Sequence, residues 1–305
     1  MSEVSINKDT PPIALITGAT GFVGSHLAQH LVTAGWQVHV IIRERSKLPN
    51  ASVFEHITTH THDGSTEGMV ECVSQASPDV VFHLASLFLS QHETKDVKHL
   101  IQSNVLFGNQ LLEAMWVNGV SRLINTGTSW QHYNNEDYNP VCLYAATKQA
   151  FEAILEYYIQ ACGVKAITLK LFDTYGLDDS RQKLFNLLNK AATSGDPLNM
   201  SPGEQLIDLV HVDDVIGAYL ISANRLLEDK VLQHESYAVS SGNPIPLREL
   251  VQLYGTVTGK NIAVNWAARP YRFREVMNTW NKGSKLEGWE LKNGFEIGIK
   301  KSNLT

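Results

Sequence analysis

The sequence has few cysteines and no long apolar run, and each absence excludes a class of protein. The 305 residues include only three cysteines, which form no CxxC pair: Cys72, Cys142 and Cys162. Such a sparse, odd set is typical of reduced thiols, so we expect a cytoplasmic protein without a disulfide framework. No apolar run reaches the ~18 residues of a spanning helix, and the polar start lacks a signal-peptide core, so we expect no membrane partner.

The sequence also lacks a strong charge of one sign. Its formal net charge is −6 and it has no basic run, which disfavours nucleic acid as a partner. The twelve histidines include His56, His60 and His62, but no cysteine or carboxylate pattern accompanies them, and we predict no metal site. Hydrophobic residues make up 43% and charged residues 18% of the chain, as in ordinary globular proteins of one or two domains.

Apolar strands and amphipathic helices alternate through the first half of the chain. Strands are expected at 13–17, 38–42, 80–84, 122–126 and 166–171, and helices at 25–34, 70–77, 95–117 and 144–160. This order predicts an α/β fold, a Rossmann doubly wound parallel sheet in residues 1–172. Residues 173–305 are expected to form a smaller C-terminal substrate lobe, with some segments returning to the main sheet.

A glycine-rich segment connects the first expected strand to the first helix. In Gly18-x-x-Gly21-x-x-Gly24, the glycines allow a tight turn and a close approach of the backbone to a pyrophosphate. A second strand follows about 20 residues on, and this context favours a dinucleotide site over a plain turn. The same cofactor site is expected to include the intervening residues Thr20, Phe22 and Val23.

The end of the second strand indicates which dinucleotide binds. An acidic residue there would hold the ribose hydroxyls of NAD, but the chain has Arg43, followed by Arg45 and Lys47. Their charges suit a 2′-phosphate, so we predict NADPH, with NAD less favoured and an ordinary solvated loop as the alternative. Asp63, in a later His-Asp-Gly turn, is either an adenine contact or an ordinary turn residue.

A phenol and an ammonium lie four residues apart in Tyr144-Ala-Ala-Thr-Lys148. On a helix these positions share one face. A fixed positive charge favours the phenolate, so the pair suits acid–base chemistry on an alcohol or a ketone. Alone, the same spacing also describes a solvated pair on any amphipathic helix, and the interpretation depends on the other motifs.

Five motifs occur together: Gly18-x-x-Gly21-x-x-Gly24, His83-Leu-Ala-Ser86, Tyr144-x-x-x-Lys148, Leu171-Phe-Asp-Thr-Tyr-Gly176 and Val210-His-Val-Asp-Asp214-Val. In this order they resemble the extended short-chain dehydrogenase/reductase family, in its NAD-dependent epimerase/dehydratase group that acts on nucleotide sugars. The resemblance runs through nearly the whole chain. It implies an enzyme with a nucleotide-sugar substrate, and a homodimer formed by the helices at 95–117 and 144–160.

The resemblance also implies roles for single residues. Tyr144 exchanges a proton with the sugar oxygen, while Lys148 binds the nicotinamide ribose and lowers the pKa of Tyr144. The third catalytic group is expected to be Ser129, with Thr128 as the near alternative. Further cofactor contacts are implied for Leu84, Ala85, Ser86 and Asn104, of which the last also supports the active-site helix.

Departures from the family pattern indicate the reaction. Family dehydratases carry an Asp-Glu pair where this chain has Trp130 and Gln131, neither of which can act as an acid or base at neutral pH. Reduction or 4-epimerisation remains, and the basic residue Arg43 favours an NADPH-dependent reductase. The chain is similar to the CDP-abequose and CDP-paratose synthase type of 4-ketoreductase, which implies deoxysugar and O-antigen biosynthesis.

The substrate end departs from the pattern as well. Asp173 and Ile207 stand where the family often has Asn and Arg near the diphosphate. A carboxylate there would repel a diphosphate unless nearby cations compensate. The candidate cations are Arg181, Lys183, Arg272 and Arg274, and the substrate contacts are expected to be Thr128, Trp130, Gln131, Asp173, Arg181 and Arg274.

Three alternatives to an NADPH-dependent reductase of nucleotide sugars remain open at this point. The first is a nucleotide-sugar 4-epimerase with tightly bound NAD. The second is a non-catalytic NADP-binding regulator, although such proteins typically lose the Tyr or the Lys that this chain keeps. The third is a reductase of non-nucleotide carbonyls, similar to the plant flavanone-type reductases.

Overall fold

The computed structural model describes residues 10–44, 46, 55–181 and 183–302, and the chain forms two compact units. Unit 1 consists of Met1–Thr128, Cys142–Lys170 and Ile216–Tyr237. Unit 2 consists of Ser129–Val141, Leu171–Val215 and Ala238–Thr305. The chain therefore passes between the units several times, and the division at residue 172 stays a prediction.

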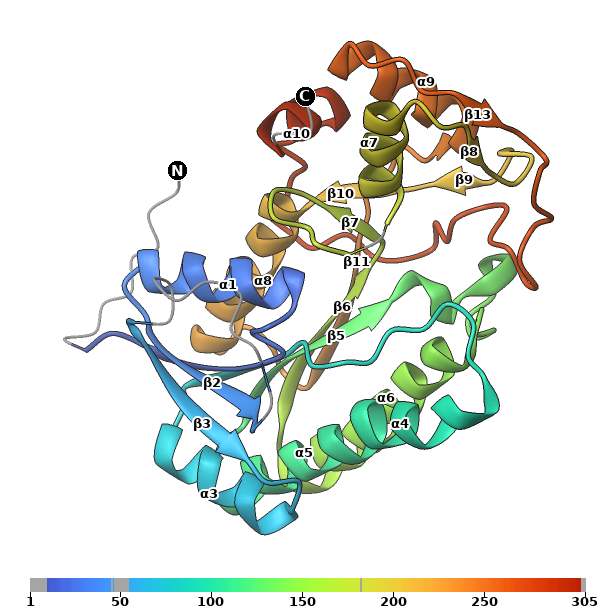
Figure 1. The fold of residues 1–305 in the computed structure, drawn as a ribbon. Coiled ribbons are helices and arrows are strands. Elements are labelled where there is room, and N and C mark those ends of the chain that lie inside the picture. Colours follow the sequence, from blue (N-terminus) through green and yellow to red (C-terminus); the bar gives the residue numbers. More distant parts are fainter. Residues whose placement is uncertain (1–9, 45, 47–54, 182, 303–305) are drawn as a thin grey trace. The chain divides into compact units, whose positions relative to one another are not determined.

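Unit 1 is built on a seven-stranded sheet with the order β11-β6-β5-β4-β1-β2-β3. Its strands are β1 (Ile13–Thr17), β2 (Gln37–Arg43), β3 (Ile57–His62), β4 (Val80–His83), β5 (Arg122–Thr128), β6 (Lys165–Leu171) and β11 (His234–Val239). Its helices are α1 (Phe22–Thr33), α3 (Thr66–Ala76), α5 (Phe107–Val117), α6 (Leu143–Cys162) and most of α8 (Val212–Leu227). Figure 1 shows α1 and α8 on one face of the sheet and α3, α5 and α6 on the other. The predicted Rossmann α/β fold is confirmed.

The strand order reverses beside β1. From β1 the chain builds outward through β2 and β3 on one side, and then through β4, β5 and β6 on the other. The pairs of β1 with β2 and with β4 are parallel, and Ile16 aligns with both Val40 and Phe82. The carboxyl ends of these strands therefore meet at the switch point, where sheets of this kind bind ligands.

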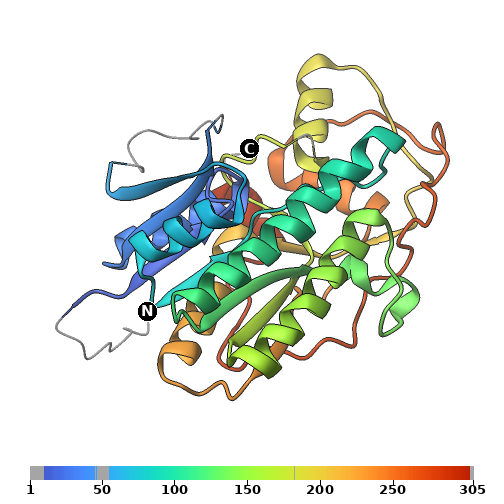
Figure 2. The same ribbon diagram turned by 90° about the horizontal axis from the view of Figure 1, so that it is seen from below.

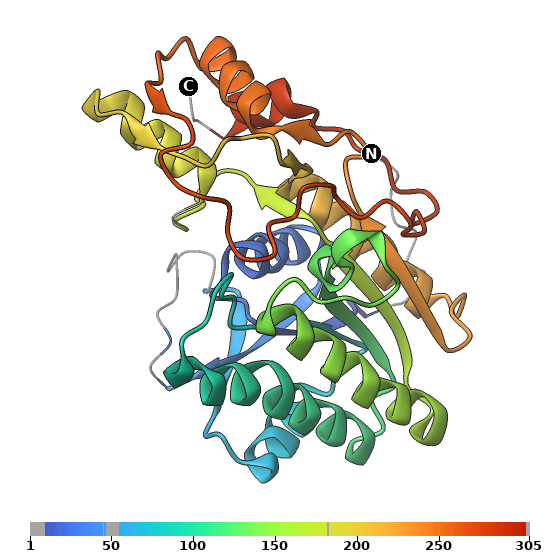
Figure 3. The ribbon, with the colours of Figure 1, turned by 90° about the vertical axis from the view of Figure 1, so that its right-hand side faces the viewer.

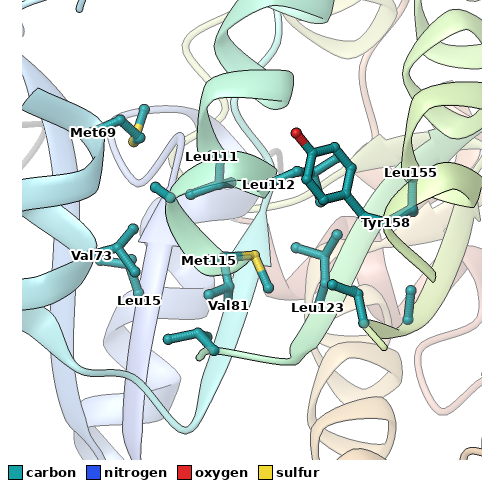
Figure 4. Close-up of a cluster of buried hydrophobic side chains, with 14 of the residues drawn as sticks. Leu15, Met69, Val73, Val81, Leu111, Leu112, Met115, Leu123, Leu155 and Tyr158 are labelled. Carbon is teal, nitrogen blue, oxygen red and sulfur yellow. The ribbon is translucent and has the colours of Figure 1, made fainter. Parts of the chain in front are cut away.

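Apolar residues at helical spacing fix α3, α5 and α6 to the sheet. Figure 2 shows α5 and α6 running side by side, and Figure 4 shows the core that they enclose. Leu15 and Leu123 from the strands pack with Leu111 and Met115 of α5 and with Leu155 of α6. Full burial of such side chains stabilises the fold by about 1.5–3 kcal/mol each.

The single helix predicted at 95–117 is interrupted. It consists of a 3₁₀ turn (Thr94–Asp96), α4 (Val97–Ile101), a π-helical turn (Gln102–Leu106) and α5. One extra residue in a π turn changes the direction of the side chains that follow, and such turns are frequent at functional sites. The described residues include no helix with both the length and the apolar composition needed to cross a membrane.

The described residues of unit 2, whose ribbon Figure 3 shows from the side, form three two-stranded pairs and three α-helices around a second core. β7 (Asp173–Tyr175) pairs with β10 (Leu209–His211), β9 (Leu206–Ile207) with β12 (Ile245–Pro246), and β8 (Leu198–Asn199) with β13 (Val264–Asn265). The helices are α7 (Leu184–Ser194), α9 (Leu247–Thr258) and α10 (Phe295–Lys301). Tyr175, Phe185 and Tyr254 form the aromatic centre of this core.

Candidate active site

The turn between β1 and α1 requires glycine at two of its three predicted positions. Gly18 has φ +80°, and a Cβ there would lie 2.6 Å from the backbone nitrogen of Ala85. A Cβ at Gly24 would collide with the carbonyl of Gly18. Gly21 stands at the N-cap of α1 and offers no side-chain cap, so a pyrophosphate oxygen can approach the N–H groups that begin the helix.

A cavity of about 560 Å³ lies at the carboxyl ends of β1, β2 and β4. The predicted cofactor residues that line it are Gly18, Thr20, Gly21, Arg43, Leu84, Ala85 and Ser86. Sequence reasoning missed Ser46, Asp96, His99 and Phe107, which also line it. These residues come from a loop and from the interrupted helix, where no motif marks them. The glycine turn, the helix terminus and the cavity fit a dinucleotide.

Two predicted cofactor residues have local partners of their own. Arg43 ends β2 with an exposed side chain, and its backbone N–H donates to the Ser46 hydroxyl at 3.0 Å. Arg45 and Lys47, which follow it, lie outside the described residues. Asp63 Oδ1 accepts from the backbone N–H and the hydroxyl of Ser65 at 2.8 and 2.7 Å, which lowers the pKa of Asp63. Its contact with adenine stays a prediction.

Tyr144 lies at the start of α6 between two hydroxyl groups. The side chains of Ser86 and Thr128 hydrogen-bond its phenol, and the ring of Phe88 meets its ring edge-on at 5.0 Å. Burial raises the pKa of Tyr144 above its ordinary value, and the two hydroxyls oppose that rise only in part. The phenol therefore holds its proton at neutral pH and is available as a general acid.

Lys148 lies one helical turn after Tyr144 and is only 3% exposed. Burial lowers its pKa to about 8, while the carboxylate of Glu152 acts in the opposite direction. The resemblance implied that Lys148 lowers the pKa of Tyr144. In the structure the pKa of Tyr144 lies above its ordinary value, because burial of the phenol outweighs the groups that stabilise its anion.

One of the two hydroxyls that hydrogen-bond Tyr144 is that of Thr128, the alternative to the predicted Ser129. Thr128 is the last residue of β5 and is buried, so the strand end fixes its position. Ser129 begins a 3₁₀ turn, belongs to unit 2 and lines a cavity there. The structure therefore brings Thr128, Tyr144 and Lys148 together within unit 1.

Asn104 connects the π-helical turn to the neighbouring strand end and to α6. Its Oδ1 accepts from the Leu87 N–H at 2.7 Å and from the Ser86 hydroxyl at 3.2 Å. Its Nδ2 donates to the Leu87 carbonyl at 3.0 Å and to Thr147 Oγ1 at 2.9 Å. These four bonds hold Ser86 in place and fix α6 beside it.

Unit 2 contains a small cavity of about 40 Å³ with an aromatic and charged lining. Trp130 and Asp173, two of the predicted substrate residues, line it, and so does Arg272. The Arg272 guanidinium lies 5.6 Å from the centre of the Trp130 ring and forms two hydrogen bonds with Glu275, at 3.0 and 2.7 Å. Asp173 lies 3.6 Å from the Lys183 ammonium. Asp173, Arg272 and Glu275 therefore each have a charged neighbour of opposite sign, while Asp208 accepts from the Ser240 hydroxyl and the Ser241 N–H.

Three further predicted substrate residues of unit 2 do not line this cavity. Arg181 binds the Asp179 carboxylate at 2.6 and 2.7 Å and the Thr174 carbonyl at 3.0 Å. Arg274 has φ +56°, lies over the Tyr133 ring at 4.2 Å and donates to Asn139. The side chain of Gln131 is completely buried. Both arginines are held by partners within the unit.

Comparison with known proteins places this geometry in a family. Residues 14–234 match the model of the NAD dependent epimerase/dehydratase family. The CDP-abequose synthase of Salmonella typhimurium is 28% identical over 93% of this chain and 95% of its own length. The UDP-glucose 4-epimerase of Halalkalibacterium halodurans is 22% identical over 91% of this chain and 90% of its own.

Solved structures show the same fold. The UDP-glucose 4-epimerase of Thermotoga maritima, solved with UDP-glucose, superposes with a TM-score of 0.82 at 23% identity, covering 95% of this chain and 96% of that one. That of Thermus thermophilus, solved with NAD, gives 0.78 at 24% identity, with 95% and 97% covered. The resemblance drawn from the motifs is confirmed: the chain is an enzyme of the extended short-chain dehydrogenase/reductase type and belongs to the NAD dependent epimerase/dehydratase family.

Proposed function

We propose that this protein reduces the 4-keto group of a nucleotide-linked deoxyhexose with NADPH, as a step of deoxysugar biosynthesis. The observation that carries the proposal is the set of groups around the Tyr144 phenol in unit 1. The protonated Tyr144 phenol is hydrogen-bonded by Thr128 and lies one helical turn from the buried Lys148. This arrangement suits a keto oxygen that must gain a proton as its carbon gains a hydride.

The reduction requires a proton and a hydride at one carbonyl group. The nicotinamide cofactor, when bound, supplies the hydride. Tyr144 gives its phenolic proton to the developing alkoxide, and the Thr128 hydroxyl holds that oxygen in line with the phenol. The Lys148 ammonium stabilises the phenolate that results and binds the cofactor ribose.

NADPH is proposed over NAD because of the end of β2. Arg43 lines the cavity of unit 1 and is exposed, so its guanidinium is available to a 2′-phosphate. Ribose hydroxyls would need a carboxylate at this position. A reductase exchanges its cofactor in every cycle and benefits from a pool of reduced NADPH.

The similarity to CDP-abequose synthases over nearly the whole chain supports a nucleotide-linked deoxyhexose as substrate. Trp130 and Gln131 replace the acid–base pair of family dehydratases, which argues against loss of water. We expect NADPH absorbance to fall when the protein meets the correct member of a panel of CDP-, dTDP-, GDP- and UDP-linked 4-keto-6-deoxyhexoses. No oxidation of NADPH with any of them would reject the proposal.

The second candidate is a 4-epimerase that keeps NAD bound. The similarity to UDP-glucose 4-epimerases favours it, since a Tyr and a Lys at this spacing serve both reactions. An epimerase returns its hydride to the same sugar and consumes no external cofactor. Protein purified with NAD, interconverting two nucleotide sugars without added NADPH, would establish this alternative.

We further propose that the protein forms a homodimer through the outer face of α4, α5 and α6. Large apolar side chains are exposed along these elements, namely Val97, Ile101, Leu106, Trp116, Val117 and Tyr157. Packing of the same helices from a second copy of the chain would bury this apolar face and stabilise the dimer. Sedimentation at micromolar concentration should give twice the monomer mass.

Cys72, Cys142 and Cys162 form no disulfide within the described part of the chain, in agreement with a proposed location in the reducing cytoplasm.

A further inference from the structure

The helix of Tyr144 and Lys148 continues into a buried ion pair that the reaction above does not use. Glu152 lies one turn after Lys148 on the same face of α6. Its carboxylate is 3.5 Å from the ammonium of Lys170 on β6, and each of the two side chains is 9% exposed. A phenol, an ammonium, a carboxylate and a second ammonium therefore follow one another from α6 to the sheet.

A buried ion pair needs an explanation because burial removes two charges from water. That cost often exceeds the attraction within the pair, so the pair by itself is weak evidence of stabilisation. Apolar residues would join α6 to β6 as well as this pair does. The pair has a second effect, however: Glu152 places a negative charge one turn from Lys148.

The other surroundings of Lys148 oppose its charge. The side chain is buried, and His83 on β4 faces it from the sheet, with a pKa lowered to about 3 by burial and by Lys148. His83 is therefore neutral and donates or accepts a hydrogen bond with Thr17 at 2.8 Å. The remaining titratable neighbours are Tyr144, which is protonated, and Glu152. Of these groups, Glu152 favours the ammonium.

We propose that Glu152 is a positioning residue that keeps Lys148 protonated during turnover, and that Lys170 on β6 holds the Glu152 carboxylate in its ionised form. The inference rests on the role of Lys148 in the proposed function. Without Glu152, burial of Lys148 is uncompensated, and the ammonium loses its proton at lower pH. The Tyr144 phenolate then forms without a cation beside it. His234 on β11 also lies near Glu152 and Lys170, and burial lowers its pKa, which favours the neutral imidazole.

Lysine titration tests the proposal without any sugar substrate. Protein labelled with ¹³C at lysine Cε is followed by NMR as the pH rises, and the Lys148 signal is assigned from its loss in Lys148→Arg. In the unaltered protein this signal should titrate near pH 8. In Glu152→Gln the midpoint should fall by about one pH unit or more, the usual effect of removing a close opposite charge. An unchanged midpoint overturns the proposal.

A matched control separates this effect from a general change in α6. Glu156 lies one further turn along the helix, is exposed, and accepts from Gln160 at 2.8 Å. Glu156→Gln removes an equal charge and should leave the Lys148 midpoint unchanged. Glu152→Asp keeps the charge and should restore most of the midpoint. If Glu156→Gln shifts it as far as Glu152→Gln does, the proposal fails.

Glu152→Gln leaves Lys170 buried without this carboxylate and lowers stability for that reason alone. The double variant Glu152→Gln/Lys170→Met removes both charges and keeps the side-chain volume, and it should still lower the Lys148 midpoint, by less than the single variant because the repulsion from Lys170 is also lost. A merely structural ion pair predicts the opposite: a changed melting temperature with an unchanged Lys148 titration in both variants.

Turnover gives a second readout once a substrate is known. Turnover of Glu152→Gln should be near that of the unaltered enzyme at pH 6 and about fivefold lower at pH 8, because a smaller fraction of Lys148 is charged there. An equal loss at both pH values contradicts the proposal. Absence of turnover in the unaltered enzyme, with the NMR shift present, would reject the proposed reaction and leave the role of Glu152 standing.

Discussion

Cationic side chains in the two units of the molecule have opposite surroundings. In unit 1 the Lys148 ammonium is 3% exposed and its pKa is lowered to about 8, with Glu152 one turn away as the opposing charge. In unit 2 the guanidinium groups of Arg181 and Arg272 each form two hydrogen bonds with a carboxylate two or three residues away. Unit 1 buries a cation whose pKa is lowered, while unit 2 pairs each of these two cations with a carboxylate close to it in the sequence.

The largest effect is expected when the proposed proton donor of unit 1 is removed. Tyr144→Phe should lower kcat by about a thousandfold, since general acid catalysis contributes on this scale, while NADPH binding stays unchanged. Stopped-flow turnover and cofactor fluorescence measure the two quantities. Tyr157→Phe, an exposed position on the same helix, is the control and should behave as the unaltered enzyme. Full turnover in Tyr144→Phe would remove unit 1 as the acid–base site.

The second effect distinguishes the two hydroxyl candidates. Thr128→Val removes one of the two hydroxyls that hydrogen-bond Tyr144 and keeps the side-chain shape, so kcat should fall by about a hundredfold. Ser129→Ala should cost much less, because Ser129 opens the 3₁₀ turn and lines the cavity of unit 2. The reverse order of losses would return Ser129 to the catalytic role that the sequence predicted.

Helix and strand periodicity explain why so much of unit 1 is predictable from the sequence. An i, i+4 pair shares a helix face whatever lies around it, so the spacing of Tyr144 and Lys148 predicts that both lie on one face. The turn at Gly18 is equally local, because its φ of +80° requires glycine. Periodicity does not register the extra residue of the π turn, so the helix at 95–117 was predicted without its interruption at Asn104.

Loop residues are harder to predict, because their partners depend on how the loop folds. The resemblance implies Ser129 as the third catalytic group, but this residue begins the first of two 3₁₀ turns in the segment, and the sequence pattern does not predict these turns. In the sequence, charge is what marks the arginines of unit 2 as candidate ligands of a diphosphate. The sequence does not show that Asp179 lies against the guanidinium of Arg181, or that Tyr133 lies under that of Arg274.

The third effect concerns the end of β2. Arg43→Asp should lower the ratio of kcat/KM for NADPH to that for NADH by about thirtyfold, because a charge-assisted bond to the 2′-phosphate is replaced by repulsion. Initial rates with each cofactor give the ratio. Lys98→Asp, at an exposed position, is the charge control. Arg122→Asp is less suitable, because Arg122 binds Asp229 and the Leu226 carbonyl and its loss would disturb the structure. An unchanged ratio assigns Arg43 to an ordinary solvated loop.

The fourth effect is the pH dependence of unit 1. Lys148 is charged below its pKa of about 8 and neutral above it, so its contribution is present at low pH and is lost as the pH rises. At pH 9 kcat should lie about tenfold below its plateau, as expected for one group one unit above its pKa. Lys148→Arg, which stays charged, should flatten this alkaline limb even where its overall rate is low. A limb that persists in Lys148→Arg belongs to another group.

The smallest expected effects lie in unit 2 and test whether its paired arginines serve structure or binding. Arg274 lies over the Tyr133 ring and donates to Asn139, so Arg274→Gln should lower the free energy of unfolding by about 1–2 kcal/mol. Its KM for the nucleotide sugar should stay within about twofold. Arg272 lines the cavity beside Trp130, and Arg272→Gln should raise KM by about fivefold, the loss of one hydrogen bond.

Denaturant unfolding and steady-state kinetics on the same two variants decide between these roles. A raised KM in Arg274→Gln, with stability unchanged, would make Arg274 the phosphate ligand that its charge suggested. Unit 2 would then resemble unit 1, with a cation kept for a ligand. Lower stability with an unchanged KM in Arg274→Gln would assign Arg274 to the packing of the loop. Of the two arginines, Arg272 would then be the one that recognises charge in this cavity, and its two hydrogen bonds with Glu275 would orient its guanidinium.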